Sequence, residues 1–242
     1  MQAFILAGGL GTRLRPIVSD RPKGLASVAG AAFLEHQVKF LRRSGVTEVV
    51  LCVGYLHDQI EQYFGTGDRC GLTIHYSVEQ EPLGTAGALK NAEALIRGTF
   101  LLLNGDTHFD IDLEQLVQAH GRTVSQTPQC AGTLVLTAVS DPRAYGSVAL
   151  GPDGFINEFV EKQQSKPAGR YVSAGIYVLE PSVLTLIPPS RPVSLERDTF
   201  PAILASGRLL AGHPVRGLFV DIGTPDGYYR LNKHLEDLHP CS

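Results

Sequence analysis

The sequence "AFILAGGLGTRLRP", residues 3–16, places a short apolar run directly before a segment rich in glycine. The apolar run, Ala3–Ala7, has the length and composition of a buried β-strand. The segment after it contains four glycines up to residue 24, and ordering a glycine in a regular element costs roughly 0.5–1 kcal/mol. That is more backbone freedom than a connecting turn needs, so we expect a ligand to approach this backbone closely. The same segment carries cations that favour a polyanionic ligand, namely Arg13, Arg15 and Lys23.

Outward from this loop, strand signals and helix signals alternate up to residue 106. The predicted strands are Ala3–Ala7, Glu48–Gly54, Leu72–Glu79 and Phe100–Asp106, and the predicted helices are Phe33–Gly45, His57–Gly65 and Thr85–Ile96. These segments form successive strand–helix–strand crossovers, which predict a doubly wound, mostly parallel α/β sheet. Ligands of such sheets bind outside the carboxyl ends of the strands, where the glycine loop, Glu79 and Asp106 all fall.

The pattern changes after Pro128, where predicted strands follow one another with fewer helices between them. These strands are Gly132–Val139, Gly146–Leu150, Phe155–Lys162 and Ser173–Glu180. They predict a mixed β extension of the α/β core. Because the chain shows no repeat, low-complexity tract or Pro/Gly/Ser-rich linker, we expect a single domain over residues 1–242.

Composition excludes several classes of function. Of the 242 residues, 43% are hydrophobic and 19% are charged, with a formal net charge of −3, as in ordinary globular proteins. Clustered basic charge is absent, which argues against a nucleic-acid partner, and no apolar run is long enough for a membrane span. The four cysteines show no C-x-x-C spacing, so neither a zinc site nor a disulfide framework is indicated. We expect a cytoplasmic protein.

The glycine loop does not match the two common phosphate-binding motifs. A P-loop would end in lysine followed by serine or threonine, and this loop does not. A dinucleotide-binding fingerprint read from Gly9 would need a third glycine at position 14, which is Leu14. What remains is a glycine loop with Arg13 and, ten residues on, Lys23, a spacing that can close two cations over a triphosphate.

Two carboxylates, Asp106 and Asp221, each end a predicted β-run. They are candidate Mg²⁺ ligands, because Mg²⁺ prefers one or two carboxylates together with phosphate oxygens. Taken alone, Asp106 also fits an ordinary turn residue and Asp221 a helix-capping or surface acid. The pair Glu161–Lys162 likewise fits a solvated surface pair.

The glycine loop and further motifs, in the same order along nearly the whole chain, resemble the sugar-1-phosphate nucleotidyltransferase family, the nucleotide-diphospho-sugar pyrophosphorylases. The motifs are "LAGGLGTRLRP" (6–16), "RPKGL" (21–25), "EQEPLGTAGAL" (79–89), "NGD" (104–106), "YGSV" (145–148), "FVEK" (159–162), "SAGIY" (173–177) and "FVDIGTPDGY" (219–228). The resemblance implies a Rossmann-like nucleotide-diphospho-sugar transferase fold. Members commonly carry proline after the lysine of the second motif, where this chain has Gly24.

The resemblance also implies a role for the residues of each motif. Arg13 and Lys23 would be catalytic, and Asp106 and Asp221 would hold Mg²⁺. The residues implied to bind the nucleotide are Leu6, Ala7, Gly8, Gly9, Gly11, Thr12, Glu79, Pro82, Gly84, Thr85, Asn104 and Gly105. The residues implied to bind the sugar phosphate are Gly146, Glu161, Lys162, Ala174 and Gly175. The nucleotide-binding part would cover about residues 1–110 and the sugar-phosphate-binding part about residues 111–242.

Members of the family transfer a nucleotidyl group from an NTP to a sugar 1-phosphate and release pyrophosphate. The segment "EPLGTAGAL" (81–89) resembles the guanylyltransferase members, so we expect GTP. The segment "SLERDTFP" (194–201) resembles the D-glycero-D-manno-heptose 1-phosphate guanylyltransferases, so we expect that sugar 1-phosphate and a role in lipopolysaccharide or surface glycan biosynthesis.

Other functions remain open at this point. One is a mannose 1-phosphate guanylyltransferase, and another is a UTP- or dTTP-dependent transferase acting on a hexose 1-phosphate. A third is a regulatory domain that binds nucleotide-sugars without turnover, which the complete set of loop cations and aspartates disfavours. We expect small-molecule substrates and neither a nucleic-acid nor a membrane partner. Exposed strands after Pro128 are consistent with a homodimer.

Overall fold

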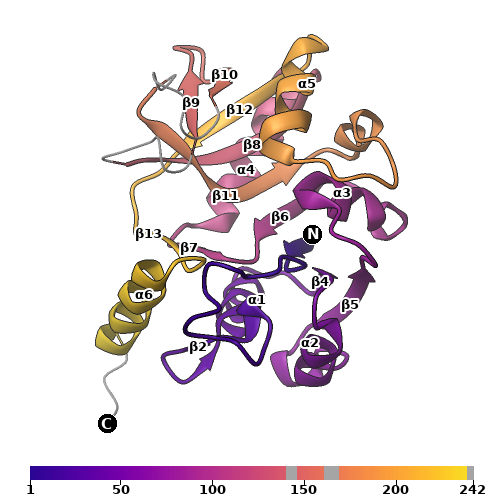
Figure 1. Ribbon diagram of the computed structural model, residues 1–242. Helices are drawn as coiled ribbons and strands as arrows, with labels where there is room; N and C mark the ends of the chain where they lie inside the picture. The colour runs from indigo at the N-terminus through magenta and orange to yellow at the C-terminus, as the bar shows by residue number, and fades with distance from the viewer. Residues whose placement is uncertain (140–145, 161–168, 239–242) are drawn as a thin grey trace.

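The computed structural model describes residues 1–139, 146–160 and 169–238 of the chain (Figure 1). A mixed β-sheet runs through it. Along one path its strands are β10 (Ile156–Val160), β9 (Ser147–Leu150), β11 (Tyr171–Leu179), β6 (Phe100–Asn104), β1 (Gln2–Leu6), β4 (Glu48–Val53) and β5 (Thr73–Val78). Strand β8 (Cys130–Ala138) pairs with β11, and β12 (Leu209–Pro214) pairs with β8.

The first half of the chain forms the parallel part of this sheet. Strand β1 pairs in parallel with β4 on one side and with β6 on the other, so that Leu6 lies opposite both Cys52 and Asn104. The chain adds β4 and β5 on one side of β1 and then returns to add β6 on the other side. The strand order therefore reverses between β1 and β6, which is the point where sheets of this class bind ligands.

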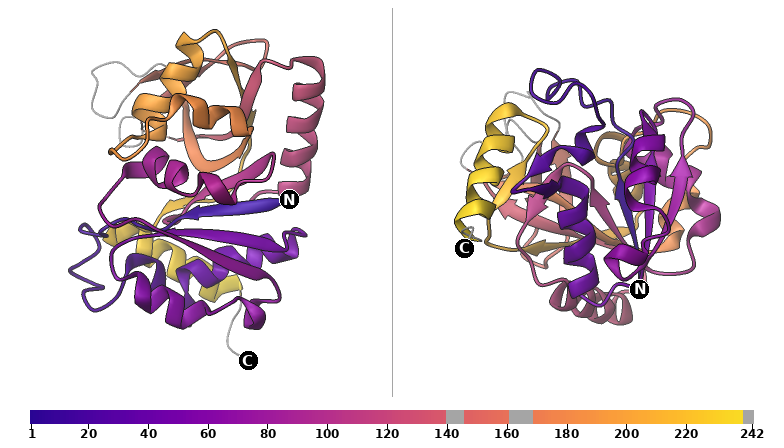
Figure 2. Two further views of the ribbon diagram at one scale, coloured as in Figure 1. Left: turned by 90° about the vertical axis from the view of Figure 1, so that its right-hand side faces the viewer. Right: turned by 90° about the horizontal axis from the view of Figure 1, so that it is seen from below.

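The sheet separates two hydrophobic cores because successive side chains of a strand point to opposite faces. In β1, Ala3 and Ile5 face one core, which is covered by α1 (Phe33–Arg43), α2 (His57–Phe64) and α4 (Leu113–Gln126), whereas Phe4 faces the other. The second core is covered by α3 (Gly84–Asn91) and α5 (Phe200–Ala205). Figure 2 shows helices on both sides of the sheet. The predicted doubly wound, mostly parallel sheet is confirmed.

Strand β11 joins the mixed extension to the parallel core. It runs antiparallel to β6, with Tyr177 opposite Leu102, and its register against β8 shifts between Ser173 and Tyr177. Gly175 lies in this bulge with φ +72°, and a Cβ there would approach Thr107 Oγ1 to 2.7 Å and Asn104 Nδ2 to 2.8 Å. Glycine is therefore required for β11 to pass this close to the end of β6.

A small third layer lies beside the sheet. It consists of β7 (Thr107–Phe109) paired with β13 (Phe219–Asp221), the hairpin β2 (Ser27–Val28) and β3 (Ala31–Ala32), and α6 (Pro225–Leu238). Its core includes Phe33, Val220 and Leu231. Apart from the β-run that ends at Asp221, which is β13, the motif pattern did not predict these elements, nor α4, α5 and β12. Short helical turns complete the described residues: Lys23–Leu25, Asp68–Cys70, Glu93–Leu95, Pro181–Leu186 and Leu195–Thr199. Within the described residues, no helix has the length and apolarity to cross a membrane.

Candidate active site

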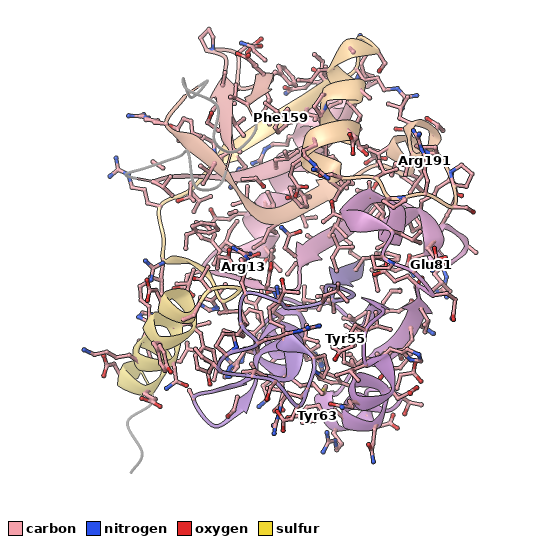
Figure 3. The ribbon with its side chains drawn as sticks, viewed as in Figure 1. Arg13, Tyr55, Tyr63, Glu81, Phe159 and Arg191 are labelled. Carbon is pink, nitrogen blue, oxygen red and sulfur yellow. The ribbon has the colours of Figure 1, made fainter. Side chains whose placement is uncertain are left out.

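A cavity of about 870 Å³ opens at the carboxyl ends of β1 and β6 and extends to β11. Many of the residues predicted from the sequence line it: Leu6, Ala7, Gly8, Gly9, Arg13, Lys23, Glu79, Pro82, Gly84, Thr85, Asn104, Gly105, Asp106, Gly146, Gly175 and Asp221. In Figure 3, Phe159 lies in the upper part of the molecule and Arg13 lies below it, near the middle, and both residues line the cavity. The cavity therefore lies between the two parts.

Other predicted residues lie elsewhere. Gly11 and Thr12 belong to the glycine loop but are not among the residues that line the cavity. Ala174 is fully buried in the core next to β6. Glu161 and Lys162 lie outside the described residues.

The glycines of the first loop are explained mainly by contacts within the protein. A Cβ on Gly8 would collide with the Glu79 carboxylate, and a Cβ on Gly24 would collide with Leu34. Gly11 has φ +61°. Only Gly9 of these four has open space where a side chain would be. In three of the four cases the constraint on the backbone therefore comes from the chain itself, and the close approach of a ligand stays a prediction.

Two cation–carboxylate pairs line the cavity near the loops that follow β1 and β6. Lys23 Nζ lies 2.6 Å from Asp106 Oδ2, and Arg13 lies 3.5 Å from Asp221 Oδ2. The two aspartates are neighbours because β13 pairs with β7, which places Asp221 opposite Thr107, and because Ile222 N donates to Asp106 O at 2.9 Å. The pairing of these strands brings together two carboxylates that are far apart in the sequence.

A buried glutamine supports the turn that carries Asp106. Gln37 Nε2, from α1, donates to Asn104 O at 2.8 Å and to Thr107 O at 3.0 Å. Gly105 N also donates to Leu6 O at 2.9 Å, which ties this turn to the end of β1. Sequence analysis missed Gln37, although a glutamine between Leu34 and Val38 on the apolar face of a helix is a signal of a buried polar contact.

Glu79 closes the cavity on the side of β4 and β5. Its Oε2 accepts a hydrogen bond from Leu83 N at 3.1 Å. Burial raises the pKa of the Glu79 carboxyl, and the hydrogen bond from Leu83 partly opposes this shift. Cys52 lies fully buried beneath, where burial and the charge of Glu79 raise the thiol pKa to about 12, so the thiol stays protonated at neutral pH.

A second wall of the cavity consists of β11 and the turn Leu195–Thr199, and sequence analysis gave no roles to its polar side chains. Its polar residues are Ser173, Tyr177, Ser194, Glu196 and Arg197. Burial, and then the charge of Glu196, raise the pKa of Tyr177 well above its usual value, so this phenol keeps its proton. The segments "SAGIY" and "SLERDTFP" pointed to this region without identifying these side chains.

The side chains that line the cavity can supply only some of the ligands that a Mg²⁺ ion needs. No group of three or more His, Cys, Asp or Glu side chains suited to a metal occurs in residues 1–139, 146–160 and 169–238. Asp106 and Asp221 alone fit Mg²⁺, which keeps several waters and takes the remaining ligands from substrate phosphates.

Comparison with known protein families decides the family. The family described as "Nucleotidyl transferase" matches residues 2–238. The chain belongs to this nucleotidyl transferase family. The resemblance inferred from the motifs is confirmed.

Among curated members of the family, the chain is 37% identical over 232 residues to the mannose-1-phosphate guanylyltransferase of Mycobacterium tuberculosis, covering 95% of this chain and 63% of that protein. It is 39% identical over 234 residues to the mannose-1-phosphate guanyltransferase of Emericella nidulans, covering 94% and 62%. The chain thus spans about three fifths of the length of these curated relatives.

Solved structures of nucleotidyltransferases share this fold. HddC from Yersinia pseudotuberculosis, also solved in complex with GMP-PN, superposes with a TM-score of 0.81 at 28% identity, over 97% of this chain and 99% of that one. A putative glucose-1-phosphate thymidylyltransferase from Bacillus anthracis gives a TM-score of 0.86 at 25% identity, over 98% and 96%. The predicted nucleotidyltransferase fold is confirmed along nearly the whole chain.

Proposed function

We propose that this protein transfers a guanylyl group from GTP to mannose 1-phosphate, giving GDP-mannose and pyrophosphate. The observation that carries the proposal is the pair of cation–carboxylate contacts, Lys23–Asp106 and Arg13–Asp221, at the switch point of the sheet. Curated relatives named for mannose 1-phosphate favour this sugar over the heptose that the motif "SLERDTFP" suggested.

The chemistry needs positioning rather than a general base. The second pKa of a phosphate monoester is about 6, so the attacking oxygen of the sugar 1-phosphate is already ionised at neutral pH. Arg13 and Lys23 would hold the triphosphate while its charge shifts toward the departing pyrophosphate. Asp106 and Asp221 keep both cations at the cavity before substrate arrives, and they would also hold Mg²⁺. Bound Mg²⁺ would neutralise phosphate charge and orient the reacting groups.

The base would be read by Glu79 and the loop that follows it. The Watson–Crick edge of guanine presents two neighbouring N–H donors, N1–H and N2–H, and a carboxylate can accept from both. Uracil and thymine offer only one N–H, flanked by carbonyl oxygens that a carboxylate would repel. Glu79 lines the cavity together with Pro82, Gly84 and Thr85. This arrangement, and the GMP-PN complex of HddC, support GTP.

The sugar phosphate would lie toward β11, where Gly146 and Gly175 line the cavity. We propose that Glu161 and Lys162 bind it, as the family motif implies. D-glycero-D-manno-heptose 1-phosphate is the second candidate, because Ser194, Glu196, Arg197 and Pro201 of its motif all line the cavity. We also propose a single domain, with the nucleotide bound by about residues 1–110 and the sugar phosphate by about 111–242.

A substrate panel tests this function. GTP, UTP, dTTP, CTP and ATP would each be combined with mannose 1-phosphate, the heptose 1-phosphate and glucose 1-phosphate, with Mg²⁺ present, and pyrophosphate release would be measured. We expect GTP with mannose 1-phosphate to give the highest kcat/KM. A preference for UTP or dTTP would overturn the guanylyl assignment. Nucleotide-sugar binding without pyrophosphate release from any pair would instead support a regulatory binding domain.

A further inference from the structure

Glu196 stands in the second wall of the cavity, and its partners among the described residues are all hydroxyl groups. Its Oε1 accepts from the Tyr177 hydroxyl at 3.2 Å, and its Oε2 accepts from Thr85 Oγ1 at 3.2 Å and Ser194 Oγ at 3.1 Å. Tyr177 belongs to β11 and Thr85 to α3. The carboxylate is therefore fixed from three separate segments of the chain.

Each of these hydroxyl groups has its proton committed to Glu196. Thr85 Oγ1 accepts from Leu195 N at 2.8 Å, and Ser194 Oγ accepts from Arg197 N at 3.2 Å. The Tyr177 hydroxyl accepts from Ser173 Oγ at 3.0 Å. Because an ionised carboxylate can only accept, each of the three hydroxyl groups donates its single proton toward Glu196, and these donors fill an acceptor site on each. The orientation of the whole group is thus set before a ligand binds.

The hydrogen-bond acceptor sites of Glu196 that the protein does not fill indicate which kind of ligand it can bind. A carboxylate has about four acceptor sites, and three of them are filled here by the protein. Among the described residues Oε1 accepts only from the Tyr177 hydroxyl, which leaves one of its acceptor sites unfilled, and Glu196 lines the cavity. A phosphate would be repelled by this charge. A neutral hydroxyl group is the ligand that suits it, because hydrogen bonds to a charged acceptor are stronger than those between neutral groups.

We propose that Glu196 is the specificity-determining residue for the sugar, with Oε1 accepting a hydrogen bond from one ring hydroxyl of the sugar 1-phosphate. Tyr177, Thr85 and Ser194 are positioning residues that act through it. This inference rests on the proposed function, because it takes the sugar 1-phosphate as the ligand beside β11. It extends that function by naming the group that recognises a hydroxyl, as distinct from the phosphate.

The test compares mannose 1-phosphate with its 2-deoxy, 3-deoxy, 4-deoxy and 6-deoxy analogues, in the wild type and in Glu196→Gln, with GTP saturating. We expect the wild type to lose ~10–10²-fold in kcat/KM for the one analogue that lacks the recognised hydroxyl. Glu196→Gln should lose a similar factor for mannose 1-phosphate itself. It should show little further loss for that analogue, while its discrimination of the other analogues stays as in the wild type.

Glu114→Gln, a carboxylate on α4 outside the cavity, is the matched control and should leave every ratio unchanged. Calorimetric binding of GTP should also be the same in the wild type and Glu196→Gln, which shows that the nucleotide side is intact. If Glu196→Gln lowers kcat/KM for mannose 1-phosphate and all analogues by one common factor, Glu196 does not select a hydroxyl and the proposal is wrong.

Failure of the proposed function gives a different result. In that case the wild type releases no pyrophosphate from GTP with any sugar 1-phosphate, and the same comparison is then made on calorimetric binding of the sugar 1-phosphates. Unchanged ratios there also overturn the role of Glu196.

If Glu196→Gln does not fold, Tyr177→Phe removes one of the three donors and should reduce discrimination of the same analogue by a smaller factor. Unchanged discrimination in Tyr177→Phe would contradict the proposal.

Discussion

On the nucleotide side of the cavity, the candidate residues stand on loops that main-chain contacts hold in place. Gly105 N bonds to Leu6 O, Ala7 N bonds to Cys52 O, and glycine lets the backbone pack directly on Glu79 and Leu34. On the side of β11, hydroxyl groups converge on one carboxylate instead. Under the proposed function, main-chain packing would suit a part that binds a triphosphate common to all NTPs, whereas side-chain contacts could change with the sugar.

The largest effect should come from replacing Asp106 or Asp221, the two aspartates on the nucleotide side of the cavity. We expect Asp106→Asn or Asp221→Asn to lower kcat by ~10³-fold or more, because each removes a charge that would hold Mg²⁺. Circular dichroism should show an unchanged fold, since neither side chain belongs to the core. Asp58→Asn, on the exposed face of α2, is the control. Near wild-type turnover in either variant would show that the two-aspartate site is wrong.

The next effect separates the two sides by kinetics. Arg13→Ala should mainly lower kcat, by ~10²–10³-fold, because Arg13 would stabilise charge that develops on the departing pyrophosphate. Lys162→Ala should instead raise KM for the sugar 1-phosphate, because uniform binding of a substrate appears in KM. Steady-state rates with each substrate varied in turn decide this, with Arg122→Ala on α4 as control. If Lys162→Ala raised only the KM for the nucleotide, Lys162 would not bind the sugar 1-phosphate, and the prediction would be wrong.

A third prediction concerns the backbone packing itself. Gly24→Ala would place a methyl group against Leu34, which is fully buried at the start of α1, so the turn Lys23–Leu25 must shift. Since a displacement of about 1 Å can cost ~10²-fold in rate, we expect a loss of that order in kcat/KM as Lys23 moves from Asp106. Family members commonly carry proline here, whereas in this chain the Leu34 side chain fills the space where a Cβ would be.

A double variant, Gly24→Ala with Leu34→Ala, tests whether a clash with Leu34 displaces the turn that carries Lys23. Leu34→Ala should cost about 2–5 kcal/mol in the free energy of unfolding while leaving turnover by the folded protein largely intact. Combined with Gly24→Ala, it should restore turnover without restoring stability. Gly121→Ala, on the exposed side of α4 with open space for a methyl group, is the matched control. If the double variant is no more active than Gly24→Ala, a clash with Leu34 is not the cause of the lost turnover.

The smallest effect concerns pH. Because burial raises the pKa of Glu79, the folded protein binds this proton more tightly than the unfolded chain does. The contribution of Glu79 to stability is therefore greatest below the ordinary carboxyl pKa of 4.5 and is lost as pH rises through the raised value. Glu79→Gln should flatten this part of the curve of unfolding free energy against pH, measured by urea denaturation. A curve of unchanged slope would contradict the burial of this carboxyl.

Much of the nucleotide side was predictable because its signals are local. The run Ala3–Ala7, the glycine loop and the turn at Asp106 lie at or next to strand ends, so the rule for parallel sheets placed them together. The second wall was not predictable in the same way. In the sequence, Tyr177 is an ordinary aromatic residue of a strand and Thr85 an ordinary residue of a helix start. Only the fold brings both hydroxyl groups to Glu196. Sequence patterns describe neighbours along the chain, and these contacts join residues up to 111 positions apart.

The sequence by itself determined the α/β class, the positions of the loops after β1 and β6, the family, and the set of cations and carboxylates. Strand and helix periodicity and turn chemistry are properties of short segments, so they can be read without the fold. Only the tertiary structure decided that Asp221 lies beside Asp106, that Gln37 supports the turn between β6 and β7, and that Gly24 packs on Leu34. The first outcome depends on strand register, where a shift of one residue would turn Asp221 to the other face, and the other two depend on packing between distant segments.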